Sequence, residues 1–320
     1  MAWQYPCSIP ILQAPIGSAA GIDLCSGVSE AGALGGLALT WRGPGSVQKI
    51  VQGVRSRTDL PFYGNYALHF DPKTLNEAIE SGIPILTFSW GDPSPYIAKV
   101  KSAGIATGVQ VTSIDSAKRM LDLGVDFLIV QGIEAGGHVQ ASRPLLDTLI
   151  DVVECAHQTP VFAAGGLANG GDLRQVMRVG ASGGVFGTRF LASVESEAHP
   201  EYKERLVHSN SSETVLTTCF DIGWPNAQHR VLQNSTFKQW ESHGCPSTGN
   251  RPGEGDVLAY TASGESIIRY EDTMPRLDYK GEWEPMCLYA GASVDRVSHI
   301  MPASAIVQQI WKEAQDSDLL

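Results

Sequence analysis

The sequence lacks a hydrophobic run long enough to cross a membrane, because no stretch approaches about 18 consecutive apolar residues. Residues 1–10 have neither the basic start nor the apolar core of a secretory signal peptide. Positive charge is also scarce: 23 Lys and Arg face 34 Asp and Glu, for a formal net charge of −11. A surface of that sign repels phosphate backbones and anionic lipids. We therefore expect a cytoplasmic protein that binds neither nucleic acid nor membranes.

Cysteine is sparse and scattered. Only six cysteines occur in 320 residues, and no two of them have the C-x-x-C spacing of a zinc or redox site. In a chain this long, that distribution indicates reduced thiols rather than a disulfide framework. The H-E-x-x-H motif of zinc proteases and the serine elbow of triad hydrolases are absent as well. No metal site is expected, and these two kinds of hydrolysis are excluded.

The sequence does contain a repeated pattern of helix, glycine and apolar run. A helical stretch ends at Gly32, Gly82, Gly104, Gly124 or Gly180, and a short apolar run follows within a few residues. Glycine just past a helix adopts the left-handed conformation at little cost, so a strand can begin at once. The runs are continuously apolar, as in parallel strands buried on both faces. The expected strands are residues 11–16, 35–39, 62–68, 84–88, 107–111, 126–130, 160–164 and 183–187.

Eight such units, most of them starting about 20 to 30 residues apart, favour a closed barrel over an open sheet. An open doubly wound sheet usually carries G-x-G-x-x-G after its first strand, where this chain has Ala14-Pro15-Ile16-Gly17. A length of 320 residues, 43% of them hydrophobic, is enough to bury such a core. We predict an α/β protein built on a (β/α)8 TIM barrel.

The repeat stops after Phe190. Residues 200–239 look helical, residues 243–255 are rich in Gly, Pro and Ser, and residues 257–260 and 266–270 flank a turn like a β-hairpin. Apolar spacing near residues 305–311 predicts a closing helix. We therefore expect a barrel formed by residues 1–203 and 285–320. Residues 204–284 would form a smaller mixed insertion that caps the barrel mouth.

In TIM barrels the functional site lies at the carboxyl ends of the strands. Glycine-rich turns follow the seventh and eighth strands, at residues 164–170 and 187–188. Their backbone N–H groups, with the helix that begins near Gly170, favour binding of a phosphate. The alternative is that Gly165 and Gly166 only allow a tight turn to form. Two adjacent turns with the same capability favour a phosphate-bearing ligand.

Uncharged amides stand at three other strand ends. Asn65, Gln110 and Gln131 can donate to and accept from a flat heterocycle, or they can satisfy backbone groups of the barrel mouth. Gln131 is the stronger candidate because it opens the unusual segment that continues to His138. Arg189 is the only Lys or Arg at these strand ends, so neutral groups would hold most of such a ring.

His138 is the titratable group of that segment. An imidazole near its free pKa can take or give a proton at neutral pH, and Gly136 and Gly137 before it let the backbone pass close to a ligand. A histidine that is merely hydrogen-bonded at the rim is the alternative. The other histidines, His229 among them, are mostly expected on solvated helix surfaces or in the segment after Phe190, and His69 is the second candidate. Glu134 is expected to brace the loop.

At these residues the sequence resembles the nitronate monooxygenase family of FMN-dependent TIM-barrel enzymes, over about residues 9–193. The segments that carry the resemblance are Gln13-Ala14-Pro15-Ile16, Gln131-Gly132-Ile133-Glu134-Ala135-Gly136-Gly137-His138, Ala164-Gly165-Gly166-Leu167-Ala168-Asn169-Gly170 and Gly187-Thr188-Arg189-Phe190-Leu191. The resemblance implies that FMN is the cofactor and that His138 is the catalytic base. The FMN contacts that it implies are Ala14, Pro15, Ile16, Asn65, Gln110, Gln131, Gly136, Gly137, Gly166, Val185, Phe186, Gly187 and Thr188.

Two residues depart from the family pattern. Gln140 stands where the family commonly has glycine, two residues after the histidine, and Val185 stands where it often has glutamine. The first departure is expected to change how a substrate fits beside the flavin. The second is expected to affect a single FMN contact.

The resemblance implies oxidation of alkyl nitronates by FMN and O₂ to a carbonyl compound and nitrite. The alternative is a reductase in which NAD(P)H reduces FMN and the flavin then reduces an enoyl thioester or a quinone, because the same motif serves such enzymes. A third hypothesis is a non-catalytic barrel that binds a phosphorylated metabolite, and His138 beside both glycine turns argues against it. The expected partners are a small-molecule substrate and O₂. The sequence leaves the oligomeric state open, a homodimer included.

Overall fold

The computed structural model describes residues 3–316 and places eight parallel strands in one sheet. The strands are β1 (Ile11–Gln13), β2 (Gly35–Ala38), β3 (Phe62–Ala67), β4 (Ile85–Ser89), β5 (Ala106–Val111), β6 (Phe127–Gln131), β8 (Val161–Ala164) and β9 (Gly183–Phe186). Their order is β1-β9-β8-β6-β5-β4-β3-β2. The two ends of the sheet meet through Leu34, whose N–H donates to Ile11 O and whose carbonyl accepts from Gln13 N, both at 2.9 Å. The predicted TIM barrel is therefore confirmed.

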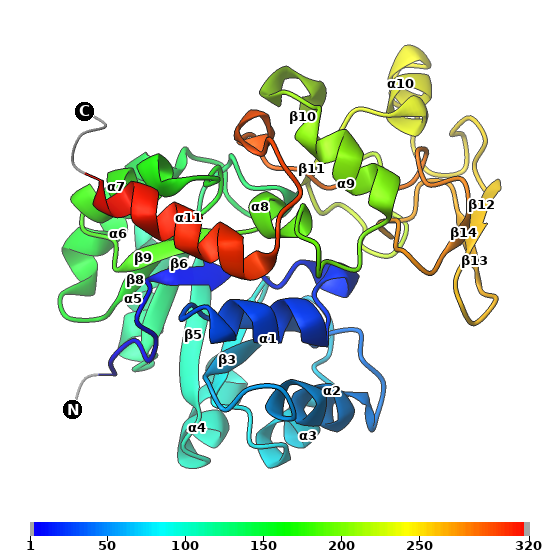
Figure 1. The fold of residues 1–320 in the computed structure, drawn as a ribbon. Coiled ribbons are helices and arrows are strands. Elements are labelled where there is room, and N and C mark those ends of the chain that lie inside the picture. Colours follow the sequence, from blue (N-terminus) through cyan, green and yellow to red (C-terminus); the bar gives the residue numbers. More distant parts are fainter. Residues whose placement is uncertain (1–2, 317–320) are drawn as a thin grey trace.

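Helices surround the barrel (Figure 1). They are α1 (Ile22–Glu30), α2 (Ser46–Arg55), α3 (Leu75–Glu80), α4 (Ser94–Ser102), α5 (Ile114–Asp122), α6 (Leu145–Ala156) and α7 (Gly170–Arg178). The C-terminal helix α11 (Ala303–Gln315), also expected, packs between α7 and α1 and completes the outer layer. The five glycines that follow predicted helices all have positive φ, from 69° to 101°. This left-handed conformation explains why glycine recurs at these helix ends.

The barrel has a packed interior and a sealed amino end. Phe127 and Phe162 fill the interior with other buried apolar side chains, and a second core lies between the strands and the helices. Trp3 stacks on Phe127 with ring centroids 4.8 Å apart, and the Tyr5 hydroxyl donates to Ile9 O and Ile11 O. These residues cover the amino end of the barrel, whereas its main cavity lies at the carboxyl ends of the strands.

The segment between the barrel strands and α11, residues 192–302, is called the tail here. It follows the short helix α8 (Thr188–Leu191) and lies to the upper right in Figure 1. Its elements are α9 (Pro200–Val207), η2 (Ser211–Glu213), β10 (Thr214–Thr217), β11 (His229–Leu232), α10 (Ser235–Ser242), β12 (Val257–Tyr260), β13 (Ser266–Ile268), β14 (Lys280–Gly281) and η3 (Val294–Arg296). A further short helix, η1 (Gly17–Ala19), follows β1.

The tail corrects one sequence expectation and confirms two. Residues 200–239 are not helical throughout, because residues 214–217 and 229–232 form an antiparallel strand pair. These residues form strands because β11 also pairs with a barrel loop. Local apolar spacing cannot reveal such long-range pairing. The hairpin of β12 and β13 is confirmed, and residues 243–255 contain neither helix nor strand, as expected for a loop.

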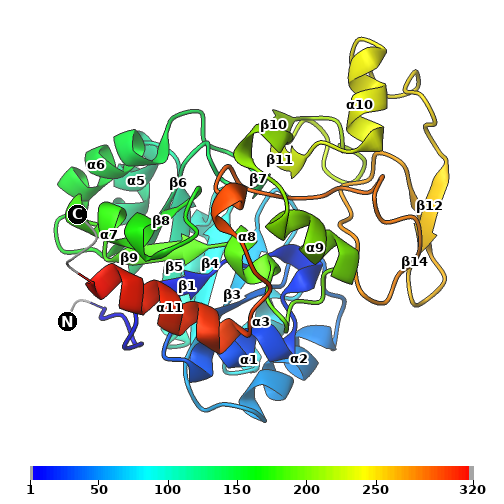
Figure 2. The ribbon, with the colours of Figure 1, turned by 45° about the horizontal axis from the view of Figure 1, so that its top comes forward.

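A small sheet joins the tail to the barrel. Strand β7 (Gly137–His138), in the loop after β6, lies beside β11 (Figure 2) and pairs antiparallel with it. In this pairing His138 lies opposite His229. On the same edge of β11, beyond β7, Leu232 N donates to Leu288 O at 2.8 Å. The predicted division at residues 203/204 and 284/285 remains a proposal.

Candidate functional site

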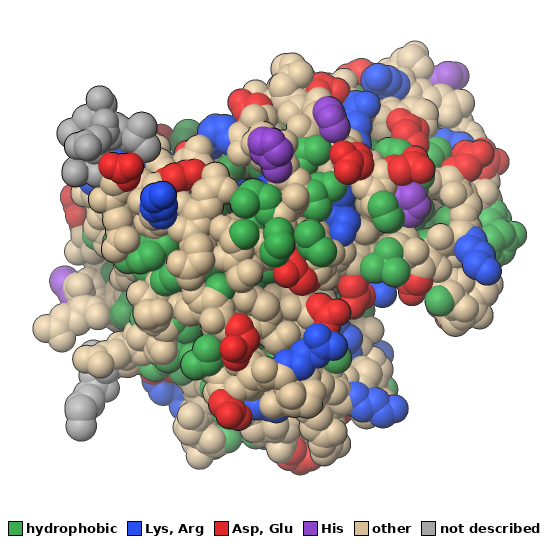
Figure 3. All heavy atoms as spheres, in the orientation of Figure 1, with side chains coloured by type: hydrophobic (Ala, Val, Ile, Leu, Met, Phe, Trp, Pro, Cys, Tyr) green, Lys and Arg blue, Asp and Glu red, His purple; other side chains and the backbone are tan. Residues whose placement is uncertain are grey.

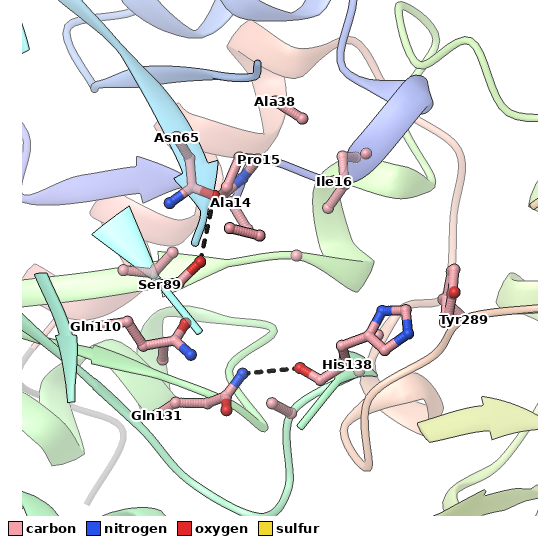
Figure 4. Close-up of a pocket in the computed structure, with 18 of the residues that line it drawn as sticks. Ala14, Pro15, Ile16, Ala38, Asn65, Ser89, Gln110, Gln131, His138 and Tyr289 are labelled. Carbon is pink, nitrogen blue, oxygen red and sulfur yellow. Dashed lines mark hydrogen bonds between the residues drawn. The ribbon is translucent and has the colours of Figure 1, made fainter. Parts of the chain in front are cut away.

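One cavity of about 660 Å³ opens at the carboxyl ends of the barrel strands. The tail completes its wall with residues that include Trp224, Asp272 and Tyr289. The predicted residues that line it, besides His138, are Ala14, Pro15, Ile16, Asn65, Gln110, Gln131, Gly136, Gly137, Gly166, Val185, Gly187 and Thr188 (Figure 4). No Lys or Arg lines it. Its size lies within the range of about 300–1,000 Å³ that is typical of cofactor and ligand pockets.

Phe186 is the predicted cofactor contact that the structure places elsewhere. Successive side chains of a strand point to opposite faces, and Val185 faces the barrel interior. Phe186 therefore points outward, and it is fully buried in the core between the strands and the helices. Its carbonyl accepts from Ala14 N at 2.9 Å, so its backbone supports the cavity wall.

The three predicted amides are engaged with protein groups. Asn65 donates to Thr87 Oγ1 at 3.0 Å and accepts from Ser89 Oγ at 3.4 Å. Gln131 donates through Nε2 to His138 O at 3.1 Å, while its Oε1 accepts from Gln140 N at 2.8 Å. The Gln131 side chain thus holds the backbone on both sides of Val139. It positions the segment that carries the histidine (Figure 4).

Gln110 is linked to Gln140, the residue that departs from the family pattern. Gln110 Nε2 donates to Gln140 Oε1 at 3.1 Å, and the same oxygen accepts from Trp90 N at 3.3 Å. Trp90 has a positive φ of 59°, which is unfavourable for a bulky residue. The Gln140 side chain therefore ties together two residues that line the cavity.

The glycine turns differ in how they could receive a phosphate. Gly165 and Gly166 have φ values of 113° and 71°, and both line the cavity. Two N–H groups in the first turn of α7 already have partners, because Asn169 Oδ1 accepts from Asp172 N and Glu313 accepts from Gly170 N. The expected contribution of the α7 N-terminus to phosphate binding stays a prediction. The short helix α8 begins at Thr188 in the cavity wall, and its first N–H groups have no partner within the helix.

Gly136 and Gly137 meet different requirements. A Cβ at Gly136 would lie 2.4 Å from Gly291 N, so glycine there allows the tail backbone to pack against the loop. Gly137 has a φ of 74°, and a Cβ there would meet nothing within 4 Å. Of the two, Gly137 faces open space beside the cavity.

His138 projects into the cavity from β7 (Figure 4). Its side chain is 12% exposed, and the ring of Trp224 lies over it with centroids 4.2 Å apart. The Nε2 atom is buried without a hydrogen-bond partner among the described residues, and Asp272 Oδ2 lies 3.9 Å away. Burial lowers the pKa of His138 to about 3, with further lowering by His229 and His69. The imidazole is therefore neutral at pH 7.

His229 is the neighbouring group that the sequence did not single out. It is fully buried, and its pKa is lowered by burial to about 4. Its Nε2 accepts from Phe220 N at 3.2 Å. Its Nδ1 lies 3.0 Å from Ala227 O, so Nδ1 must carry the proton. Since both ring nitrogens are used, His229 is a structural histidine.

Other predicted roles can be located too. Both carboxylate oxygens of Glu134 accept from Leu145 N, at 3.3 and 3.0 Å, so Glu134 braces the loop as expected. His69 stacks on Trp224 outside the cavity lining, with centroids 5.5 Å apart. Arg189 donates to His299 O at 2.8 Å and so holds the tail. Asp272 and Tyr289 had no local sequence signal, because only folding of the tail brings them to the cavity.

Within residues 3–316, no group of three or more His, Cys, Asp or Glu side chains is arranged to hold a metal ion. No helix in the same range has the length and apolar content required to cross a bilayer. All six cysteines are free thiols. Acidic and basic side chains are interspersed over the face in Figure 3, which shows no broad basic area.

The fold and the site define a TIM-barrel protein with a neutral histidine, its Nε2 unpartnered among the described residues, in a pocket at the barrel mouth that no Lys or Arg lines. The chain belongs to the nitronate monooxygenase family, whose model matches residues 65–313. Several relatives named nitronate monooxygenase or probable nitronate monooxygenase are 26–30% identical over 96–97% of this chain.

A Mycobacterium tuberculosis relative is 32% identical over 239 residues and is named (3aS,4S,5R,7aS)-5-hydroxy-7a-methyl-1-oxo-octahydro-1H-indene-4-carboxyl-CoA dehydrogenase. The match covers 73% of this chain and 65% of that protein, which is less than two thirds of its length. Among solved structures, FabK from Thermotoga maritima has a TM-score of 0.79 and 27% identity, covering 97% of this chain and 93% of FabK. Nitroalkane oxidase from Streptomyces ansochromogenes has a TM-score of 0.76 and 25% identity, covering 97% and 96%. The named relatives are oxidoreductases.

Proposed function

We propose that this protein uses FMN and O₂ to oxidise alkyl nitronates to a carbonyl compound and nitrite. The observation that carries the proposal is the neutral imidazole of His138, whose Nε2 has no hydrogen-bond partner among the described residues, in a pocket that no Lys or Arg lines. Membership of the nitronate monooxygenase family and similarity to a nitroalkane oxidase support the same chemistry.

The pocket residues fit FMN. Asn65, Gln110 and Gln131 would surround the isoalloxazine ring, with the backbone of residues 14–16 on another side. The phosphate would be held by the turn at Gly165 and Gly166 and by the first N–H groups of α8, in the place where barrels of this fold bind phosphate. A bound FMN would supply the redox chemistry, with O₂ as the final electron acceptor. FMN binding is supported by the family and the pocket together.

The proposed role of His138 is to take the α-proton when the substrate is a neutral nitroalkane. A neutral imidazole can accept that proton, whereas a preformed nitronate needs no base. Trp224 over the imidazole and Tyr289 beside it, with ring centroids 5.5 Å apart, would keep water from the reacting carbon. The chain's contribution is thus to place the substrate, exclude water and move one proton.

The second candidate is an FMN-dependent reductase that takes electrons from NAD(P)H and acts on an enoyl thioester or a quinone. The similarity to FabK over 97% of this chain favours this alternative, as does the relative named as a carboxyl-CoA dehydrogenase. In that reaction His138 would donate a proton or orient the acceptor.

Anaerobic stopped-flow spectroscopy separates the two candidates. The purified, FMN-loaded protein would be mixed separately with an alkyl nitronate, NADH and NADPH while the flavin absorbance is followed. We expect rapid bleaching by the nitronate and none by either nicotinamide. Fast reduction by a nicotinamide without reduction by the nitronate would assign the protein to the reductases. A protein that binds no flavin after incubation with FMN would contradict both candidates.

A further inference from the structure

The tail contributes a carboxylate to the cavity that neither the sequence motifs nor the proposed function uses. Asp272 lines the cavity, and its side chain is 20% exposed. Its backbone is held from two sides, because its N–H donates to Ile222 O at 3.0 Å and its carbonyl accepts from the Tyr289 hydroxyl at 2.7 Å. Among the described residues, His138 is the only Lys, Arg or His whose side-chain nitrogen lies within 4.0 Å of this carboxylate.

The neighbouring backbone makes room for the carboxylate. Gly223 has a φ of 108°, and a Cβ there would lie 2.4 Å from Asp272 Oδ1. Any other residue at position 223 would therefore be strained and would also push the carboxylate away. The glycine leaves Asp272 directed at the histidine.

The histidine has a nitrogen that needs such a partner. His138 Nε2 is buried and unpaired, which costs about 1–3 kcal/mol for a polar atom removed from water. Its distance of 3.9 Å to Asp272 Oδ2 is about 1 Å longer than an N–H···O hydrogen bond. Catalytic hydrogen bonds are often long before substrate binds and tighten in the complex. Small side-chain rotations would close this gap, while Trp224 limits the movement of the ring.

We propose that Asp272 is the positioning partner of His138: its carboxylate holds the imidazole proton on Nε2, so that the lone pair of Nδ1 is free to take the substrate proton. This inference rests on the proposed oxidation of nitroalkanes and nitronates. It assigns Asp272 to the step before electron transfer, and only for neutral substrates.

The proton and electrons balance without another reactant. The α-carbon–hydrogen bond breaks, its electron pair forms the C=N bond of the nitronate, and the proton goes to His138 Nδ1. The resulting imidazolium carries protons on both nitrogens, and the Asp272 carboxylate stabilises its charge without taking a proton. Aspartate has this role beside histidine in other enzymes, where it fixes the tautomer.

The other titratable groups around this pair do not compete for its role. His229 uses both ring nitrogens, and His69 lies outside the cavity lining. Glu271 accepts from Ile268 N at 3.2 Å, and burial raises the pKa values of Tyr289 and Cys287 well above their usual range. Burial also raises the pKa of Asp272, to about 7. Asp272 is therefore the group whose ionisation changes near neutral pH.

The test compares the FMN-loaded wild type with Asp272→Asn on two forms of one substrate, nitroethane and its preformed nitronate. We expect kcat/KM for nitroethane to fall about 10- to 100-fold in the variant, with the nitronate changed less than about threefold. In the wild type, kcat/KM for nitroethane should rise with pH through about 7, and this step should disappear in Asp272→Asn. Glu271→Gln, which removes the adjacent carboxylate, is the matched control and should retain both activities and the pH step, moved to lower pH because the charge of Glu271 helps to raise the pKa of Asp272. Equal losses on both substrates, or an unchanged pH profile, would overturn the proposal.

A second measurement does not depend on activity. In ¹⁵N-histidine NMR spectra of the FMN-loaded protein, His138, assigned with His138→Gln, should carry its proton on Nε2 above pH 7. In Asp272→Asn the Nδ1–H tautomer should gain population. If the wild type oxidises no nitronate, the proposed function fails while this measurement still tests the pair. The same tautomer in both proteins would rule out the pairing itself.

Discussion

The barrel and the tail build the same cavity with different chemistry. The barrel contributes strand ends with neutral amides, glycine turns and backbone N–H groups, such as Asn65, Gln131 and Gly166. The tail contributes a carboxylate, a phenol and an indole, from Asp272, Tyr289 and Trp224. Only His138 brings an imidazole from the barrel, and it does so on the short strand that pairs with the tail. The barrel therefore supplies most of the cavity wall, and the tail supplies the carboxylate nearest to His138.

The two histidines that face each other across this contact show the same contrast. His138 belongs to a barrel loop and His229 to the tail, and the two are paired in register on β7 and β11. His229 has partners on both nitrogens, whereas His138 Nε2 has none among the described residues. Residue type and location are nearly the same, so the hydrogen-bond partners decide which histidine can react.

The largest effect on activity is expected when each of these two histidines is replaced by glutamine in a separate variant. His138→Gln should keep bound FMN but lose about 10²- to 10⁴-fold in kcat/KM for a neutral nitroalkane, since general-base catalysis is removed. Activity on the preformed nitronate should fall much less.

The matched variant His229→Gln should act on stability instead. It should lower the free energy of unfolding by about 1–3 kcal/mol because glutamine has no donor in the position of the Nδ1–H that His229 gives to Ala227 O. Urea unfolding and kinetics with both substrate forms measure the two effects. Similar losses on nitroalkane and nitronate in His138→Gln would refute proton abstraction by His138.

The packing of the tail against the loop after β6 can be tested by substituting Gly136 and Gly137, the two glycines before His138. Gly136→Ala should destabilise the protein by about 1–3 kcal/mol, because the new methyl group would collide with Gly291 N. Gly137→Ala should cost about 1–2 kcal/mol from its positive φ alone. Chemical denaturation gives both values. A Gly136→Ala variant as stable as the wild type would mean that the tail does not pack here as described.

The two buried histidines and Asp272 should affect the pH dependence of stability in opposite directions. His138 and His229 have folded pKa values of about 3 and 4, below the value of about 6.5 in an unfolded chain. At these two histidines the unfolded chain therefore binds more protons than the folded protein. Their contribution to the free energy of unfolding is lost as the pH falls from about 6.5 to 4. Asp272 has the opposite sign, because its folded pKa of about 7 exceeds the unfolded value of about 3.9, so its contribution is lost as the pH rises through 7.

Between pH 4 and 6.5 these three groups should leave a net slope of about one proton, or about 1.4 kcal/mol per pH unit. Relative to the wild type, Asp272→Asn should steepen this slope and His229→Gln should flatten it. Urea unfolding at three pH values in this window measures the slopes. Identical slopes in all three proteins would contradict the burial of these groups.

The smallest effect is expected at Gln140. Gln140→Gly, which restores the residue common in the family, removes the hydrogen bonds to Gln110 and Trp90. Each bond contributes about 0.5–1.5 kcal/mol, so we expect a several-fold rise in KM for substrate and little change in the affinity for FMN. Gln140→Glu keeps an acceptor at the same place and should restore most of the loss. A variant with unchanged KM would show that this link does not shape the pocket.

The barrel could be predicted from the sequence because its signals are local and repeated. Gly32, Gly82, Gly104, Gly124 and Gly180 mark helix ends by their backbone conformation, and continuous apolar runs mark buried strands. The position of His138 at the cavity follows from the same regularity, because the carboxyl ends of barrel strands converge. Phe186 shows where sequence prediction of single contacts fails. Neighbouring side chains of a strand point to opposite faces, so the Phe186 side chain lies in the core and not in the cavity.

The sequence by itself determined the barrel, the glycine turns and the residues that these bring to the mouth, because strand and helix periods act over short distances. Only the tertiary structure decided which groups surround His138. Asp272 and Trp224 lie far from it along the chain, and they reach it because β11 pairs with β7 and Gly136 lets the tail backbone approach. Partners, burial and charge are properties of that long-range packing. They decide the pKa of His138, and no local pattern encodes them.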